Sequence, residues 1–189
     1  MIELKNALNK NLFRKIKEEV ESDRTPWFFR TTAYNDGSNE KDISNWSYSH
    51  LVIDDGEHIS YLAPYFESAI LEILDKLNVS YEKILRVRIG CITVMPKQYT
   101  NLPHIDWKFE HQTGLLYLNE ADGDTILYNK SWNGEDFTDT DQVKKLNLKE
   151  ETRITPEENK FILFNGLQYH SSSTPTNTFR RIVVNFNII

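Results

Sequence analysis

The sequence has only one cysteine, no long apolar run and no excess of positive charge. Cys91 stands alone and cannot form an internal disulfide, so the chain suits a reducing compartment. No window approaches the roughly 20 apolar residues of a membrane-spanning helix, and the charged N-terminal segment lacks the apolar core of a signal peptide. We therefore expect a cytoplasmic protein with no membrane partner, and we expect Cys91 to be a small buried side chain.

The formal net charge is −6, which is the wrong sign for a surface that neutralises phosphates along a nucleic acid. Nucleic acid is therefore not expected as a partner. With 189 residues, of which 39% are hydrophobic, the chain is long enough to bury one core. The sequence predicts a single domain over residues 1–189 and leaves the oligomeric state open.

Two kinds of pattern divide the chain. Residues 1–82 contain two segments with helical periodicity, carried by Leu12, Phe13, Ile16 and Val20 in the first and by Leu62, Phe66, Ala69, Ile70, Ile73 and Leu77 in the second. Residues 83–189 are short β-rich runs broken by turn residues, which is typical of a sandwich or barrel. We expect a mainly β fold with flanking helices, in which "PWFFRTTAY" and "YSHLVID" add edge strands.

Residues 131–158 contain few apolar side chains and carry eight acidic residues against four basic ones. Long loops of this kind in a compact domain are usually functional or mobile. We interpret the segment as an excursion from the core, with Trp132 as a candidate lid residue. A solvated surface insertion is the alternative.

The stretch "NLPHIDWKF" places His104 and Asp106 two residues apart. On a strand, both side chains would point to the same face and could hold one metal ion, although such a pair is also a simple polar interruption of a strand. His170 follows 66 residues later, on a late β-rich run. Two imidazoles and one carboxylate are the ligand set of non-haem Fe(II) oxygenases. The remaining histidines are assigned structural or surface roles: His50, His58 and His111.

The last run, "FRRIVVNFNII", brings arginine to the start of an apolar strand. An unpaired buried cation is costly, so an anion is expected there, and a guanidinium presents a fork that suits a carboxylate. Strand alternation puts Ile182, Val184, Phe186 and Ile188 on one face, and Arg181, Val183, Asn185 and Asn187 on the other. Arg181, which lies 11 residues after His170, is therefore favoured over Arg180 as the anion-binding residue.

In their order and spacing, "HID", "YH" and "RRIVVNF" resemble the 2-oxoglutarate- and Fe(II)-dependent dioxygenases, especially the prolyl-hydroxylase-like branch. Weaker similarities are "LLYLN", "DGDTILY" and "KFILFNG", and the resemblance covers residues 84–189. It implies a double-stranded β-helix, or jelly roll, with helices packed on the larger sheet. It also implies Fe(II) held by His104, Asp106 and His170, 2-oxoglutarate held through its distal carboxylate by Arg181, and O2 as the oxidant.

Other residues receive roles from this resemblance. Tyr117 matches a tyrosine that contacts the same carboxylate in prolyl hydroxylases, with a core aromatic as the alternative. Asn185 shares the face of Arg181 and is a candidate for the cosubstrate pocket, or else an ordinary polar residue of a strand. Trp107 and Phe109, beside the proposed ligands, are candidates for contact with the substrate, although a tryptophan in the place of Trp107 is more often a packed core aromatic.

Two departures from the family pattern limit the assignment. Met95 stands where relatives of the prolyl hydroxylases often have tyrosine, and Asn187 stands where the nucleic-acid demethylase branch has a second arginine. The sequence thus predicts a hydroxylase, with a peptidyl-prolyl target as the first hypothesis. The alternatives are hydroxylation of a free amino acid or small metabolite, and a non-catalytic jelly-roll binding module.

Overall fold

The computed structural model describes residues 1–30, 47–134, 143 and 145–189. In this part of the chain, no helix is long and apolar enough to cross a membrane. The elements follow in the order β1 (Ile2–Leu4), α1 (Lys10–Val20), β2 (Phe28–Arg30), β3 (Ser47–Asp54), β4 (Glu57–His58), α2 (Ala63–Leu77), β5 (Ile84–Thr93), β6 (Gln112–Tyr117), β7 (Thr125–Ser131), β8 (Glu150–Ile154), β9 (Phe161–Asn165), β10 (Gln168–Ser172) and β11 (Arg180–Ile188).

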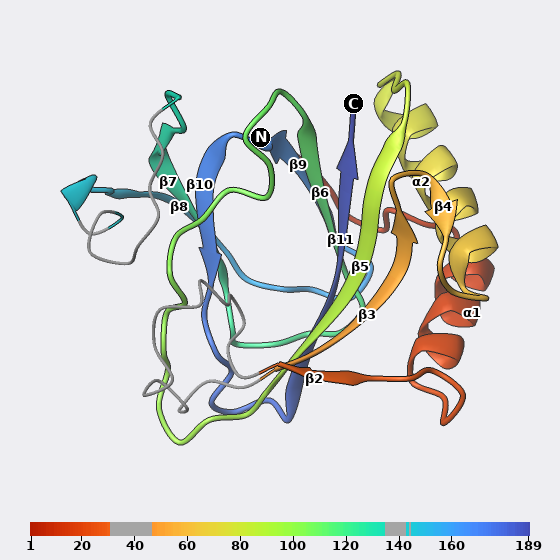
Figure 1. The fold of residues 1–189 in the computed structure, drawn as a ribbon. Coiled ribbons are helices and arrows are strands. Elements are labelled where there is room, and N and C mark those ends of the chain that lie inside the picture. The colour runs from red at the N-terminus through yellow and green to blue at the C-terminus, as the bar shows by residue number, and fades with distance from the viewer. Residues whose placement is uncertain (31–46, 135–142, 144) are drawn as a thin grey trace.

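Two antiparallel sheets face each other (Figure 1). Within the described residues, the larger sheet has the strand order β1-β9-β6-β11-β5-β3-β2, with β4 paired to β3, and the smaller sheet has the order β10-β7-β8. The chain crosses repeatedly between the sheets in its C-terminal half: β6, β9 and β11 belong to the larger sheet, and β7, β8 and β10 to the smaller one. The predicted jelly roll is confirmed.

Both helices cover the outer face of the larger sheet (Figure 1). The apolar stripe of α1 and that of α2 pack against side chains of β5 and β11 in one continuous core. The β11 contribution is the predicted apolar face: Ile182, Val184, Phe186 and Ile188. The helices form because their apolar residues recur at the helical period, and burial against the sheet stabilises them.

Strands β5 and β11 pair along most of their length at the centre of the larger sheet. Arg181 lies opposite Ile92, Asn185 lies opposite Arg88, and Asn187 lies opposite Arg86. Residues opposite each other on antiparallel strands point to the same face. The inner face of these two strands is therefore rich in polar and cationic side chains.

Two sequence-based predictions are wrong in part. The run "YSHLVID" forms β3, which is an interior strand between β5 and β2 and not an edge strand, because β2 pairs with its free side. The excursion at residues 131–158 contains strand β8, which pairs with β7. Its charged side chains face away from the core and hide the strand signal, while Ile154 is buried. Residues 31–34, 135–142 and 144 of the two predicted segments lie outside the described residues.

Candidate metal centre

His104 and Asp106 lie in the loop between β5 and β6, outside the named strands, so the strand geometry considered for this pair does not apply. Of these two residues, His104 pairs with strand β10. Its amide donates to the carbonyl of His170, and the amide of His170 donates to the carbonyl of His104, each at 2.9 Å. Pro103, just before, has no amide hydrogen and cannot extend the ladder. This isolated bridge brings two histidines together that are far apart in sequence.

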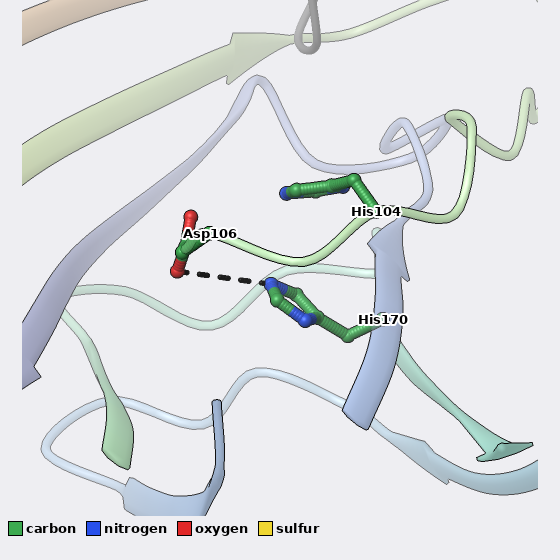
Figure 2. A group of neighbouring side chains, drawn as sticks. All are labelled: His104, Asp106 and His170. Atoms are coloured by element: carbon green, nitrogen blue, oxygen red, sulfur yellow. Dashed lines mark ion pairs between the residues drawn. The ribbon is translucent and has the colours of Figure 1, made fainter. Parts of the chain in front are cut away.

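The side chains of His104, Asp106 and His170 point toward one another (Figure 2). One ligand atom from each lies within 4.8 Å of the other two. His170 Nε2 is 3.9 Å from Asp106 Oδ2, and both side chains are almost fully buried. Within the part of the chain that the structure describes, this is the one group of three or more potential metal ligands whose ligand atoms lie so close together.

Hydrogen bonds at the back of both imidazole rings fix which nitrogen faces the centre. His170 Nδ1 lies 3.0 Å from the carbonyl oxygen of Gln168, and His104 Nδ1 lies 3.3 Å from that of Leu102. A carbonyl can only accept, so Nδ1 carries a proton, and Nε2 is the nitrogen that holds the lone pair in the neutral ring. His170 Nε2 is buried and has no hydrogen-bond partner in the described part of the chain. Burial lowers the pKa of His104 to about 3, which keeps that ring neutral.

Asp106 is held as a carboxylate by donors on three sides. Arg86 Nη2 donates to Oδ1 at 2.7 Å, while the amides of Asn187 and Asn185 donate to Oδ2 at 2.8 and 3.1 Å. Burial alone would raise the pKa of Asp106, but its electrostatic interactions with His170 and Arg86 and the hydrogen bond from Asn187 hold it well below its usual range. Among the described residues, Arg86 is the one donor to Oδ1, whereas Asn185, Asn187 and Thr113 all donate to Oδ2, so Oδ1 keeps a lone-pair position that a metal can use.

Arg86 and Asn187 are site residues that the sequence did not identify. The guanidinium of Arg86 also lies over the ring of Trp107, 5.4 Å from its centroid, so Trp107 contacts the centre through Arg86. Arg86 and Arg88 alternate on one apolar strand, and this signal could have indicated a charged inner face. That Arg86 contacts Asp106 could not be predicted, because the loop that carries Asp106 has no regular structure.

A cavity of about 320 Å³ lies between the two sheets and includes the three candidate ligands. Arg181 lines it and is 3% exposed. Its Nε donates to the carbonyl of Gly123 at 2.8 Å, and its Nη2 donates to the hydroxyl of Thr125 at 2.7 Å. In the described residues, no carboxylate forms an ion pair with Arg181. A buried guanidinium in this state is suited to an anionic ligand.

Tyr117 lies behind Arg181 and is fully buried. Its hydroxyl donates to Thr125 at 2.8 Å, and its ring centroid is 5.7 Å from the guanidinium carbon of Arg181. Burial raises the pKa of Tyr117, so its hydroxyl keeps its proton. Tyr117 is thus a core aromatic that contacts Thr125 and Arg181, and its predicted contact with 2-oxoglutarate stays a prediction.

Arg180, the alternative to Arg181, points away from the cavity and pairs with Glu21 at 2.8 Å.

The other side chains singled out in the sequence lie as follows. Trp132 packs in a small cluster with Tyr128 and Tyr169. Phe109 is 44% exposed and stacks on Trp107. Cys91 is buried, as predicted, and burial raises the pKa of its thiol to about 11.

The other three histidines lie outside the cluster. His50 hydrogen-bonds the carbonyl of Pro26 and the hydroxyl of Ser60. His58 pairs with Glu67 at the surface. His111 is buried against Gly166, and its Nδ1 faces the carbonyl of Phe109.

No protein-family model matches the chain, and neither does any curated protein sequence. Comparison with solved structures confirms the predicted resemblance at the level of the fold, which is that of Fe(II) oxygenases that use 2-oxoglutarate. A prolyl hydroxylase from Trichoplax adhaerens, in complex with a hypoxia inducible factor oxygen degradation domain peptide fragment, is 13% identical. The match covers 100% of this chain and 82% of that one, with a TM-score of 0.60.

Two bacterial structures are similar to the same degree. An oxidoreductase of the 2OG-Fe(II) oxygenase family from Burkholderia pseudomallei is 14% identical over 99% of this chain and 84% of that one, with a TM-score of 0.62. HygX from Streptomyces hygroscopicus, solved with nickel and 2-oxoglutarate bound, is 12% identical over 99% and 81% of the two chains, with a TM-score of 0.59. At such low identity the likeness establishes a double-stranded β-helix and leaves the substrate to be argued from the site.

Proposed function

We propose that the protein is a 2-oxoglutarate- and O2-dependent hydroxylase that uses non-haem Fe(II). One observation carries the proposal: His104, Asp106 and His170 converge within 4.8 Å in a cavity that also contains the buried guanidinium of Arg181. Two imidazoles and one carboxylate suit Fe(II) and leave coordination positions open. The donors fit the ion, since the buried Nε2 of His170 has no other partner among the described residues.

The residues of the chain have separable roles in this proposal. His104, Asp106 and His170 hold Fe(II), and the hydrogen bonds from Arg86, Asn185 and Asn187 orient Asp106 and keep it ionised. Arg181, held in place by Gly123 and Thr125, binds the distal carboxylate of 2-oxoglutarate. Bound Fe(II) supplies the oxidation chemistry, in which 2-oxoglutarate and O2 give succinate and CO2 and the substrate gains a hydroxyl group.

Two substrate classes follow from the fold and the sequence. The likeness to prolyl hydroxylases supports a proline-containing peptide as one candidate. A free amino acid or other small metabolite is the second candidate, and the positive charge of the cavity favours it. A non-catalytic binding module is the alternative of a different class, and the complete ligand set with its orienting hydrogen bonds speaks against it.

Anaerobic titration of the Fe(II)-loaded protein with 2-oxoglutarate tests the proposal. Chelation of Fe(II) by the keto acid produces a weak visible charge-transfer band, and we expect this band in the wild type. Arg181→Ala should weaken the affinity for 2-oxoglutarate by roughly tenfold to a hundredfold, because a charge-assisted hydrogen bond contributes about 1.5–3 kcal/mol. Arg180→Ala is the matched control and should bind as the wild type does, since its side chain pairs with Glu21 outside the cavity.

Turnover provides a second measurement. Succinate formation should require Fe(II) and disappear in His104→Ala. The hydroxylase proposal fails if the wild type gives neither the band nor measurable affinity for 2-oxoglutarate. Metal binding without recognition of 2-oxoglutarate would support the binding module instead.

A further inference from the structure

The inner cavity has an unusual charge for an acidic protein. Arginine side chains line it at four positions, from β2, β5 and β11: Arg30, Arg86, Arg88 and Arg181. Asp106 is the one carboxylate among the described residues that line the cavity. Bound Fe(II) and the 2-oxoglutarate dianion cancel each other in charge, so loading the centre would leave this positive excess unchanged. The protein as a whole has a net charge of −6, and the cavity is therefore a local exception.

Two of these arginines already have a partner or an assigned ligand. Arg86 pairs with Asp106 at 2.7 Å and stacks on Trp107. Arg181 is fixed by Gly123 and Thr125 at the end of the cavity proposed for 2-oxoglutarate. Neither arginine accounts for the remaining charge.

Arg88 is different, because it forms no hydrogen bond or ion pair with any residue that the structure describes. It is largely buried on the inner face of β5, between Arg86 and Gly90. Burial and the charges of Arg86 and Arg30 lower the pKa of Arg88, and Asp106 only partly offsets them. A cation in such surroundings is costly unless a ligand neutralises it.

Arg30 lies at the exposed end of the same region. Its Nε donates to the hydroxyl of Ser49 at 3.0 Å, and Ser49 faces Gly90 across the β3–β5 pair. Gly90 has no side chain on the cavity face, so it leaves room beside Arg88. Arg88, Arg30 and Ser49 line the same cavity, so a small anion beside Arg88 would have a second guanidinium and a hydroxyl nearby.

This group is separate from the Arg181 end of the cavity. Arg181 lies opposite Ile92, which is four residues from Arg88 along β5. At about 3.3 Å per residue the two positions are roughly 13 Å apart. The charges that lower the pKa of Arg88 are those of Arg86 and Arg30 and not that of Arg181, which agrees with two separate ends of the cavity.

We propose that Arg88, assisted by Arg30 and Ser49, binds an anionic group of the substrate, a carboxylate or a phosphate. The proposal rests on the proposed function and narrows its substrate class to small anionic molecules. A neutral internal segment of a peptide has no negative charge to pair with the guanidinium of Arg88, whereas a free amino acid or another organic acid has a carboxylate. Held by this group, the substrate would lie across the cavity from the 2-oxoglutarate end, with the metal ligands alongside.

Ligand-observed NMR with acetate, inorganic phosphate and acetamide tests the proposal. The protein is loaded with 2-oxoglutarate and with diamagnetic Zn(II) in place of Fe(II), and the titrations are repeated without metal. We expect acetate or phosphate to bind to the wild type and neutral acetamide not to bind. The tighter of the two anions indicates whether the substrate carries a carboxylate or a phosphate.

Variants decide whether Arg88 is responsible. Arg88→Gln should weaken binding of the anion by roughly tenfold or more, and Arg180→Gln, which removes an arginine outside the cavity, should leave it unchanged. Arg88→Gln should also keep or increase the resistance to urea unfolding, because the arginine has no described partner to lose. A structural arginine would behave in the opposite way.

The inference is overturned if neither anion binds, if Arg88→Gln binds the anion as tightly as the wild type, or if Arg88→Gln raises the unfolding equilibrium constant tenfold. These outcomes are distinct from failure of the proposed function, which would appear as absence of the Fe(II) and 2-oxoglutarate band. The metal-free titration keeps the two apart, because Arg88 and Arg30 do not depend on the metal.

Discussion

The two faces of the larger sheet carry opposite kinds of side chain on the same strands. On β11, Phe186 faces the helices and is 3% exposed, while its neighbour Asn185 faces the cavity and donates to Asp106. On β5, Ile89 lies in the core and Arg88 lies in the cavity. The outer face stabilises the fold by apolar burial, and the inner face holds charges whose burial costs free energy. The inner face is therefore where we expect substitutions to change binding more than stability.

The largest expected effect is the loss of metal binding in His170→Ala. Residues that only orient metal ligands contribute about 10–100-fold to metal affinity, so removal of a ligand should cost more than about a hundredfold. His111→Ala is the matched control, because it removes another buried imidazole whose Nδ1 faces a backbone carbonyl. Metal titration by calorimetry should separate the two variants. Equal affinity in both would contradict the assignment of His170 as a ligand.

The next largest effect is on stability, in Phe186→Ala. This ring packs between Phe66 and Phe161, and truncation of a buried phenylalanine costs roughly 3–5 kcal/mol of unfolding free energy. Asn185→Ala, on the opposite face, should cost less stability and weaken metal binding by about 10–100-fold through Asp106. Urea unfolding and metal titration of both variants check the contrast. If Asn185→Ala were the more destabilising change, the division between the faces would be wrong.

Substitution of two glycines, Gly123 and Gly90, compares a crowded backbone position with an open one. A Cβ at Gly123 would lie 2.6 Å from the carbonyl oxygen of Ser173, and the Gly123 carbonyl holds Arg181. Gly123→Ala should therefore cost roughly 1–3 kcal/mol and weaken 2-oxoglutarate binding. At Gly90 the nearest atom to a Cβ, in Val183, is at 3.8 Å, so Gly90→Ala should preserve stability. Calorimetry with 2-oxoglutarate tests both, and a stable Gly123→Ala with full affinity would refute the role of this turn.

The last effect is smaller in scope, because it concerns stability alone, at Asp122, away from both faces. Its carboxylate accepts hydrogen bonds from the backbone and side chains of Thr176, Asn177 and Thr178 just before β11. Burial alone would raise the pKa of Asp122, but these donors hold it well below its usual range. Asp122→Asn should cost roughly 1–3 kcal/mol at pH 7.

The pH dependence of this effect has a defined sign. Since the pKa of Asp122 is lower in the folded state, its contribution is complete above the unfolded value of about 3.9 and is lost as the pH falls toward the folded value. The stability difference between wild type and Asp122→Asn should therefore shrink as the pH is lowered below about 4. Urea unfolding over this range measures it. A difference that stays constant down to pH 2 would show that the carboxylate charge is not involved.

Much of the fold could be predicted because its periodicities are local. The helical stripes, the β-rich runs of the C-terminal half and the alternation that separates Arg181 from Ile182 all appear in short windows of sequence. Strand β8 could not be predicted, because most of its side chains are charged and only pairing with β7 makes it a strand. The interior position of β3 was likewise missed, since strand order depends on pairing between distant segments.

The sequence by itself determined which residue types were present for a metal centre and on which face of its strand Arg181 would lie. Only the tertiary structure decided that His104 and Asp106 lie in an irregular loop beside β10, that Arg86 and Asn187 hold Asp106, and that Arg88 is left in the cavity without a described partner. The physical reason is the range of the interactions. Side-chain direction on a strand follows from backbone geometry between neighbours, whereas a loop's path and the charge around a cavity are sums over segments distant in the chain.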